Sequence, residues 1–264
     1  MAIEITSVQN SRVKEWAELL TRRGRDKQKK VLLEGEHLVI EALNSGIAVE
    51  SVLYLAEKGI PFGVESYLTG EVERIAISQA VLAKCSDTET PQGVLAVARR
   101  PELAAEVLLD NREALIVALD GVQDPGNLGT IIRTADAAGA TGIVLGRGTV
   151  DPYNPKTMRS AMGSLFHLPV VEASLPQLLQ QAAAGGAKVY STGMSSGLTC
   201  YAADLSGPVW FVLGNEGAGV SAEVRGCVQQ ELSIPMPGKA ESLNVAMAGG
   251  ILLYEALRQR RFAD

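Results

Sequence analysis

Residues 209–224 read VWFVLGNEGAGVSAEV, and this stretch decides the class of fold. Its first six residues are a continuous apolar run, which is typical of a strand that is buried on both faces of a parallel sheet. A glycine-rich loop follows, and Ser221 is suited to cap a helix that begins directly after it. The order of strand, loop and helix predicts an α/β domain.

The same alternation extends outward along the chain. Apolar runs followed by turn and helix signals predict further strands over residues 115–120, 141–146, 187–192 and 231–235. Together with residues 209–214 they predict a parallel sheet that helices cover on both faces. In such sheets ligands bind outside the carboxyl ends of the strands, so the loops that leave these strands form the candidate site.

The first third of the chain predicts a smaller α/β unit. Its patterns predict strands at 31–35, 49–55 and 93–98, and helices at 36–46 and 77–84. A polar stretch with a proline, residues 99–114, is typical of a linker. We therefore expect two domains, residues 1–105 and residues 106–264, as the length of the chain also favours.

Composition argues against several classes of protein. A hydrophobic content of 47% with 20% charged residues indicates a globular chain. No apolar run reaches the roughly 18 residues of a membrane span, and the N-terminus lacks a signal-peptide pattern, so we expect a cytoplasmic protein. The three cysteines and two histidines lie far apart, which argues against a disulfide framework or a metal site.

The charge is unevenly distributed. The net charge is −6, but residues 1–30 carry eight cations against four anions, a local charge of +4. We call residues 12–30, which hold all eight cations, the basic segment. It fits either an arm that contacts phosphates or a solvated helix face, and charge alone leaves both open.

The first candidate loop, residues 121–140, reads GVQDPGNLGTIIRTADAAGA. Asp124 begins a turn by composition, and Asn127 is a candidate N-cap for the helix that follows. Arg133 is expected in the second turn of that helix, close enough for its side chain to reach back over the strand ends. The alternative is a solvated arginine, which is the commoner case for an arginine taken alone.

The second loop, residues 214–224, holds Glu216 among three glycines, and a carboxylate in so tight a loop is expected to accept hydrogen bonds. Residues 217–222 match the G-x-G-x-x-A pattern of dinucleotide sites. We disfavour a nicotinamide site, because the first glycine of the pattern stands several residues beyond the strand and Glu216 would repel a pyrophosphate.

The third loop leads from a strand end at Pro235 into a long apolar helix within residues 233–261. Ser242 is expected to cap this helix. Asn244 would then lie in the first turn, where a short amide is unfavourable unless it bonds another group.

Taken together, the three loops resemble the signature motifs of the SpoU/TrmH family of SPOUT RNA ribose 2′-O-methyltransferases. Three motifs in the family's order are far more specific than any one of them, and the resemblance covers residues 115–260, with residues 159–170 also similar. The first motif is matched by Asn127, Gly129, Arg133 and Ala135, the second by Gly214, Glu216, Gly219, Val220 and Ser221, and the third by Ile234, Pro235, Met236, Gly238, Ser242, Leu243, Asn244 and Val245.

The N-terminal third resembles the family's substrate-binding domain, which is of the ribosomal protein L30e/L7Ae type. Residues 29–43 and 92–97 carry this weaker resemblance. It implies that residues 1–105 bind structured RNA, that the basic segment belongs to the RNA footprint, and that large-subunit rRNA is favoured over tRNA.

The resemblance also implies an S-adenosylmethionine-dependent homodimer without a metal, whose C-terminal segment is threaded as a trefoil knot. The cofactor would lie in a bent conformation inside the knot, largely against backbone groups. By matching to the family, its pocket is expected to be lined by Gly193, Leu213, Gly214, Ile234, Met236 and Leu243.

Five residues are expected to act on the RNA, namely Asn127, Arg133, Glu216, Ser242 and Asn244. The family's motif-one arginine, here Arg133, is commonly assigned to activate the 2′-hydroxyl. Since an arginine pKa above about 12 makes a poor base, we expect Arg133 to anchor phosphate and ribose and to stabilise developing alkoxide charge. The other four would supply oriented donors and acceptors around the nucleotide.

Several alternatives stay open within this resemblance. They are a tRNA 2′-O-methyltransferase, a base methyltransferase of the same superfamily, an antibiotic-resistance enzyme acting on one rRNA nucleotide, and an RNA-binding ribosome assembly factor without turnover. Arg133, Glu216 and Asn244 argue against the last, because a pure RNA binder has no evident need for all three.

Overall fold

The structure, a computed structural model, describes residues 3–109, 113–193 and 196–262, and the chain divides into two compact units. The first unit comprises Met1–Glu102 and Tyr153–Phe166, and the second comprises Leu103–Pro152 and His167–Asp264. The first unit therefore includes a segment from the middle of the stretch in which the sequence predicts the catalytic domain.

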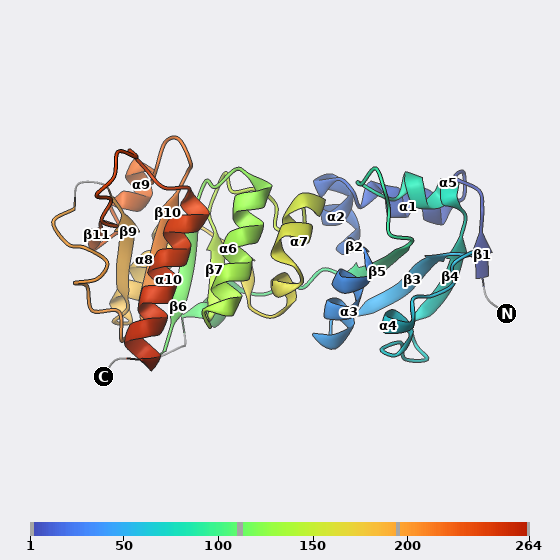
Figure 1. The fold of residues 1–264 in the computed structure, drawn as a ribbon, viewed down its shortest axis with the longest axis horizontal. Helices are drawn as coiled ribbons and strands as arrows, with labels where there is room; N and C mark the ends of the chain where they lie inside the picture. The colour runs from blue at the N-terminus through green and yellow to red at the C-terminus, as the bar shows by residue number, and fades with distance from the viewer. Residues whose placement is uncertain (1–2, 110–112, 194–195, 263–264) are drawn as a thin grey trace. The chain divides into compact units, whose positions relative to one another are not determined.

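The second unit is built on a six-stranded parallel sheet, as predicted for this α/β fold (Figure 1). Its strands are β6 (Leu115–Asp120), β7 (Gly142–Leu145), β8 (Val170–Glu172), β9 (Lys188–Thr192), β10 (Val209–Gly214) and β11 (Gln230–Leu232). Four of the five predicted strands are confirmed to within one residue at each end. The fifth, β11, ends three residues before the predicted end at Pro235, and β8 was not predicted.

The spatial order of these strands, β11-β9-β10-β6-β7-β8, changes direction at β6. The chain adds β7 and β8 on one side of β6, and it places the remaining three strands on the other side. β6 and β10 are therefore neighbours, and their last residues, Asp120 and Gly214, are paired in register. This is the switch point at which open α/β sheets bind ligands.

Helices cover both faces of this sheet. They are α6 (Pro125–Ala137), α8 (Leu175–Ala184), α9 (Ala222–Arg225) and α10 (Val245–Arg261), with a 3₁₀ turn η1 (Ala105–Leu108) within the predicted linker. α6 and α10 pack together over one face (Figure 1), where a Cβ atom on Gly249 of α10 would come within 2.8 Å of Leu213 Cδ1. Trp210 and Val212, which point to the other face, join the core that Leu178 of α8 and Val224 of α9 complete.

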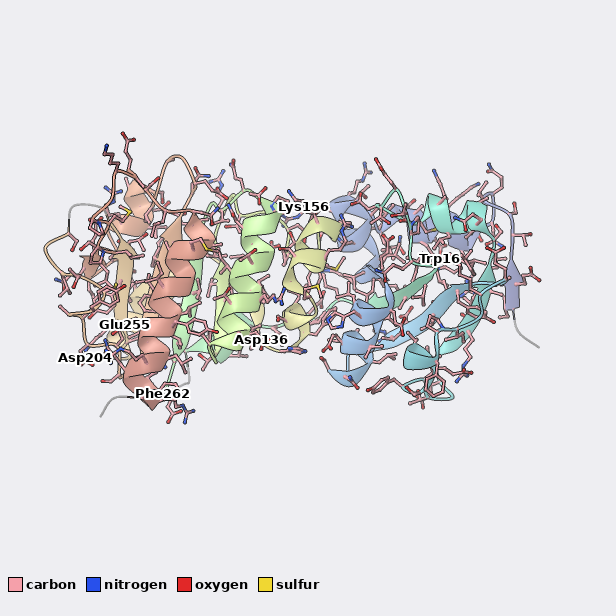
Figure 2. The ribbon with its side chains drawn as sticks, viewed as in Figure 1. Trp16, Asp136, Lys156, Asp204, Glu255 and Phe262 are labelled. Atoms are coloured by element: carbon pink, nitrogen blue, oxygen red, sulfur yellow. The ribbon has the colours of Figure 1, made fainter. Side chains whose placement is uncertain are left out.

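Hydrogen bonds anchor the C-terminal half of α10, where Glu255 lies (Figure 2). The buried Glu255 carboxylate accepts hydrogen bonds from Arg258 and Gln259 at 2.8 to 2.9 Å, and the bond from Arg258 is the main reason that the pKa of Glu255 is lowered. Arg260 donates to the carbonyl oxygens of Leu205 and Ala114 at 3.0 Å each. The helix is thus fixed at one end while its N-terminus reaches the candidate site.

The first unit has a five-stranded mixed sheet in the order β1-β4-β3-β5-β2. Its strands are β1 (Ile3–Ile5), β2 (Lys30–Glu34), β3 (Val49–Leu55), β4 (Glu73–Ile77) and β5 (Val94–Arg99), and its helices are α1 (Ser11–Glu18), α2 (Arg22–Gln28), α3 (Glu36–Asn44), α4 (Phe62–Glu65), α5 (Gln79–Lys84), α7 (Pro155–Ala161) and the 3₁₀ turn η2 (Ser164–Phe166). The three predicted strands are confirmed to within one residue, whereas β1 and β4 were not predicted. Ile77 ends β4, and Ser78 caps α5 by accepting a hydrogen bond from Val81 N at 3.3 Å.

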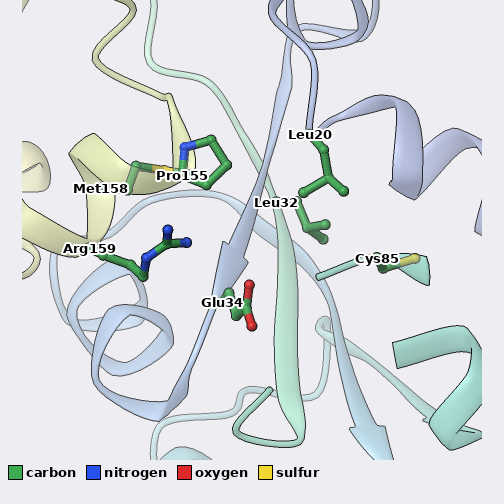
Figure 3. A pocket seen from close by; sticks show the side chains of 7 residues that line it. All are labelled: Leu20, Leu32, Glu34, Cys85, Pro155, Met158 and Arg159. Atoms are coloured by element: carbon green, nitrogen blue, oxygen red, sulfur yellow. The ribbon is translucent and has the colours of Figure 1, made fainter. Parts of the chain in front are cut away.

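The segment Tyr153–Phe166 is held in the first unit by several contacts (Figure 3). Pro155, Met158 and Arg159 of α7 line a small pocket together with Leu20, Leu32, Glu34 and Cys85. Arg159 Nη2 donates to Asp87 Oδ2 at 3.2 Å, and His37 Nε2 lies 3.1 Å from the carbonyl oxygen of Met162. Helix α7 therefore completes the core of the first unit, although it follows β7 in sequence.

The cysteines are free thiols, of which Cys85 and Cys200 are buried and Cys227 is half-buried. Burial raises the pKa of Cys85 to about 11, so this thiol stays protonated and packs as a small apolar group. Of the helices within the described ranges, none is long and apolar enough to cross a membrane.

Candidate active site

The loop after β10 is closed by one side chain, Asn215. Its Oδ1 accepts hydrogen bonds from the backbone N–H groups of Gly217 and Ala218, both at 2.9 Å, and its backbone exchanges two hydrogen bonds of 3.0 Å with Gly219. Its Nδ2 donates to the carbonyl oxygen of Gly121 at 2.8 Å, in the loop after β6. Asn215 therefore shapes its own loop and ties it to the neighbouring one.

Gly214 is required for this turn, because the loop folds back onto it. A Cβ atom at Gly214 would lie 2.2 Å from the carbonyl carbon of Gly219 and 2.3 Å from the backbone nitrogen of Val220. Gly219 has a φ of +70°, a left-handed conformation that favours glycine. The geometry of the backbone thus explains why the second motif has glycine at these two positions.

Glu216 lies in the same loop and accepts hydrogen bonds, as its position in the sequence predicts. Its Oε1 accepts from Asp124 N at 3.1 Å and from Asn127 Nδ2 at 3.0 Å, and its Oε2 accepts from Gln123 N at 3.2 Å. Partial burial raises the pKa of Glu216, but the hydrogen bonds outweigh it and hold the pKa below its usual range. An ionised carboxylate engaged in this way orients the loop after β6 and is a poor proton acceptor.

Asn127, Asn244 and Glu216 form a chain of hydrogen bonds across the three predicted loops. Asn127 donates to Glu216 through Nδ2, and its Oδ1 accepts from Asn244 Nδ2 at 2.9 Å. Asn244 Oδ1 in turn accepts from Ala246 N and Met247 N at the start of α10. Both carboxamides have hydrogen-bond partners for the oxygen and for the nitrogen, so these bonds fix the orientation of both amides.

Two predicted caps are wrong. Asp124, not Asn127, caps α6, since Asp124 Oδ1 accepts from Asn127 N at 2.8 Å and Pro125 occupies the first helical turn. Asn244, not Ser242, caps α10, which begins at Val245. Asn244 is favoured there because an N-cap needs an acceptor for the first free N–H groups, which its Oδ1 provides. The predicted cap at Ser221 is confirmed by its hydrogen bond with Val224 N at 3.4 Å.

A pocket of about 290 Å³ lies beside this chain of hydrogen bonds. It is lined by Thr192, Gly214, Asn215, Glu216, Gly219, Val220, Ser242, Leu243, Asn244, Val245 and Ala248. Five of the residues expected to bind the cofactor or to act on the RNA are among them, namely Gly214, Glu216, Ser242, Leu243 and Asn244. The pocket therefore lies between the second and third predicted loops.

The other four residues expected at the cofactor lie outside this lining. Gly193 follows β9, and a Cβ atom there would come within 2.4 Å of a carboxylate oxygen of Glu231. Leu213 is fully buried under α10, and Ile234 and Met236 are half-buried in the segment after β11. The prediction that these four residues line the cofactor pocket therefore stays a prediction.

Arg133 does not line the pocket. α6 begins at Pro125, three residues earlier than the predicted cap at Asn127 implies, so Arg133 falls in the third turn. Its side chain is exposed, and within residues 3–109, 113–193 and 196–262 it has no hydrogen-bond or ion-pair partner. Nearby on α6, Asp136 pairs with His167 at 2.8 Å.

Besides Thr192 and Ala248 of the pocket lining, two residues that shape the loops of the site were not predicted. Asn215 was overlooked although an asparagine directly before a glycine-rich turn is a signal for such a loop closure. Asp120, which is 9% exposed at the end of β6, accepts a hydrogen bond from Ser221 N at 2.7 Å and so ties the start of α9 to the sheet.

The pocket has the chemistry that S-adenosylmethionine requires. Val220, Leu243 and Val245 supply apolar walls, and amide and hydroxyl groups supply hydrogen-bond partners. The carboxylate of Glu216 favours a nearby positive charge such as a sulfonium. No group of three His, Cys, Asp or Glu side chains suited to a metal occurs in the part of the chain that the structure describes.

Sequence comparisons match both parts of the chain to known families. Residues 114–254 match the SpoU rRNA Methylase family, and residues 10–96 match the MRM3-like substrate binding domain. The 23S rRNA (guanosine(2553)-2′-O)-methyltransferase RlmP of Bacillus subtilis is 45% identical over 251 residues, which cover 95% of this chain and 98% of that protein.

Solved structures of similar proteins share the whole fold. The SpoU methyltransferase AviRb from Streptomyces viridochromogenes, in complex with its cofactor AdoMet, is 32% identical, with a TM-score of 0.89 and coverage of 97% of this chain and 100% of that one. The AdoMet-bound rRNA methyltransferase from Sinorhizobium meliloti is 34% identical, with a TM-score of 0.87 and coverage of 99% of each chain.

Proposed function

Because the chain belongs to the SpoU rRNA methylase family, we propose that it transfers the methyl group of S-adenosylmethionine to a ribose 2′-hydroxyl of 23S rRNA. The observation that carries this proposal is the hydrogen-bonded chain of Asn244, Asn127 and Glu216 at the pocket. The substrate is a guanosine, the nucleotide named for the relative that is 45% identical along nearly its whole length.

The bound cofactor supplies an electrophilic methyl group, and the protein binds it and orients the ribose. Gly214 and Leu243, which line the pocket, would hold the cofactor. By their match to the family, Gly193, Leu213, Ile234 and Met236 would contribute backbone contacts. Ser242 and the amides of Asn127 and Asn244 position the nucleotide, a task that can lower the barrier by several kcal/mol. Arg133 anchors the ribose and phosphate and stabilises the charge that develops as the 2′-hydroxyl loses its proton.

We expect S-adenosylmethionine to bind without a metal, because the pocket offers apolar walls, polar groups and the Glu216 carboxylate, which favours the positively charged sulfonium. Calorimetry with and without a chelator should give the same affinity. A binding enthalpy that disappears with the chelator, or a preference for a nicotinamide nucleotide, would contradict this assignment of the pocket.

The first unit binds the RNA in this proposal, and the second unit performs the transfer. Most cations of the basic segment are neutralised locally, since Lys27, Lys29 and Lys30 pair with Glu18, Glu102 and Glu50 at 2.6 to 3.4 Å. Arg12 pairs with Glu73, Arg22 with Asp26, and the buried Arg25 donates to the carbonyl oxygen of Leu19 at 2.7 Å. Lys14 and Arg23 are exposed and have no ion pair within the described ranges, so these two cations contact phosphates.

Replacing Lys14 and Arg23 together by alanine should weaken RNA binding and reduce its dependence on salt. Each lost phosphate contact reduces the magnitude of the slope of log affinity against log salt concentration by roughly 0.7 to 0.9. For the double variant we expect this magnitude to fall by roughly 1 to 2. The control is a Lys27→Ala/Lys29→Ala variant, whose cations are already paired with carboxylates. Equal slopes in the two double variants would count against this assignment.

The active form is a homodimer in this proposal. Met247 and Tyr254 are 54% and 53% exposed, and their spacing of seven residues places both on one face of α10. α10 packs on α6, where Gly250 faces Thr134, the neighbour of Arg133. A second copy that covers this apolar face would lie close to Arg133, which a single chain leaves outside the pocket.

Introducing charge on this face should separate the dimer. Met247→Glu/Tyr254→Glu is expected to sediment as a monomer and to lose methyl transfer, because a buried unpaired carboxylate costs several kcal/mol. Phe62→Glu is the matched control, since Phe62 is 87% exposed in the first unit and its change should leave the dimer intact. A wild-type monomer that is fully active would overturn the proposal.

Mapping of 2′-O-methylation in 23S rRNA from a deletion strain tests the function itself. The guanosine equivalent to position 2553 should lose its methyl group and regain it when the gene is restored. The proposed ribosomal substrate supports the expectation of a cytoplasmic protein. Methylation of tRNA or of a base would contradict the proposal, and RNA binding without transfer would indicate an assembly factor.

A further inference from the structure

We propose that Asn215 is a positioning residue for methyl transfer, which fixes the carboxylate of Glu216 against the loop after β6. The inference rests on the proposed function. It concerns a residue that lines the pocket but reaches the nucleotide only through its neighbours.

The two ends of the Asn215 amide do different work. Oδ1 accepts from Gly217 N and Ala218 N and so shapes the turn that carries Glu216. Nδ2 donates to Gly121 O at 2.8 Å and lies 3.5 Å from Glu216 Oε2. The Asn215 side chain thus fixes the backbone conformation of the turn that carries Glu216. It also fixes the distance between this turn and the loop after β6, from which Glu216 accepts hydrogen bonds.

The effect passes to the nucleotide through the hydrogen-bonded chain. Glu216 accepts from Asn127 Nδ2, and this contact turns Asn127 Oδ1 towards Asn244. If Glu216 were protonated or displaced, Asn127 would lose the acceptor that fixes its amide. The Asn127 amide could then rotate and leave Asn244 Nδ2 without its acceptor, although Asn244 Oδ1 would still cap α10. The nucleotide would be less well oriented, while the pocket would remain.

Two substitutions separate shaping the turn from holding the carboxylate. Asn215→Asp keeps an acceptor for Gly217 N and Ala218 N, but it removes the donor to Gly121 and places a second carboxylate beside Glu216. The negative charge of the new aspartate disfavours a second negative charge beside it, so the pKa of Glu216 should rise relative to the wild type. Asn215→Ala removes both functions without adding charge.

The test measures the pH dependence of single-turnover methyl transfer and, separately, the titration of the Glu216 carboxyl by carbon-13 NMR. In Asn215→Asp we expect the acidic limb of the rate profile, and the midpoint of the Glu216 titration, to move upward by about one pH unit or more. Affinity for S-adenosylmethionine should change by less than about threefold. Asn215→Ala should lower the rate at every pH without this upward shift.

Ala218→Asp is the charge control, because Ala218 is exposed in the same loop and donates to Asn215 only through its backbone. It should leave the Glu216 titration in place. An unshifted titration in Asn215→Asp would overturn the inference, as would a rate profile in Asn215→Asp that matches the wild type. The NMR measurement needs no RNA, so it distinguishes this failure from a failure of the proposed function, in which the wild type itself would not methylate rRNA.

Discussion

Arg133→Ala should abolish methyl transfer while leaving the fold and the binding of S-adenosylmethionine intact. The side chain is exposed on the third turn of α6, so its loss should change the free energy of unfolding by no more than about 0.5 kcal/mol. If it stabilises charge at the reacting oxygen, the single-turnover rate should fall by about 10²-fold or more. A wild-type rate in Arg133→Ala would contradict its role in the proposed site.

Arg133→Lys tests which property of the arginine matters. Lysine keeps the positive charge but loses the planar guanidinium that binds phosphate and ribose through two parallel hydrogen bonds. A bidentate anchor predicts that the lysine variant is nearly as slow as the alanine variant. If lysine restored most of the rate, charge alone would suffice and the bidentate contact would be ruled out.

Gly214→Ala should destroy the cofactor pocket. The added methyl group would lie 2.2 to 2.3 Å from backbone atoms of Gly219 and Val220, which cannot rotate away as a side chain can. The turn closed by Asn215 must open, and we expect a loss of about 3 kcal/mol in the free energy of unfolding, near the upper range for overpacking. For a chain of this size that corresponds to a fall in Tm of roughly 6–12 °C.

The same variant should lose affinity for S-adenosylmethionine by about 10²-fold, because a shift of the loop removes several pocket contacts together. Gly217→Ala is the matched control, since a Cβ atom there would meet only Asn215 Oδ1 at 3.7 Å, an ordinary contact. Thermal unfolding and calorimetry measure both variants. Equal Tm values would show that the loop tolerates a side chain at Gly214. The close approach of the Gly219 and Val220 backbone would then not be what requires a glycine there.

The sheet of the second unit was predictable where strands are long and apolar. Residues 209–214 and 115–120 form strands with the predicted ends, because both are buried along their whole length. β8 and β1 are three residues each, too short for an apolar pattern to stand out. The grouping of residues 153–166 with the first unit depends on long-range packing that no local pattern records.

The sequence was enough to predict the loops that form the site, but not the residues that cap α6 and α10. Glu216 and Asn244 stood out because each was unfavourable where it stood unless it bonded another group, and each does. Ser242 and Asn244 are both good N-caps two residues apart, and only the direction of α10 decides between them. The position of Arg133 along α6 depends on where the helix begins. This start was not predicted correctly, because the cap is Asp124 and not Asn127. The threading of the C-terminal segment as a knot stays a prediction.

The origin of α7 has a consequence during protein synthesis. The N-terminal part of the first unit is complete at Glu102, but its last piece, Tyr153–Phe166, is translated only after 50 intervening residues. At about 5–20 residues per second, the ribosome needs roughly 3–13 seconds to make residues 103–166. During this interval the nascent first unit exposes the apolar groups that α7 later covers, Leu20 and Leu32 among them. Folding of the first unit therefore cannot finish until translation of the second is well under way.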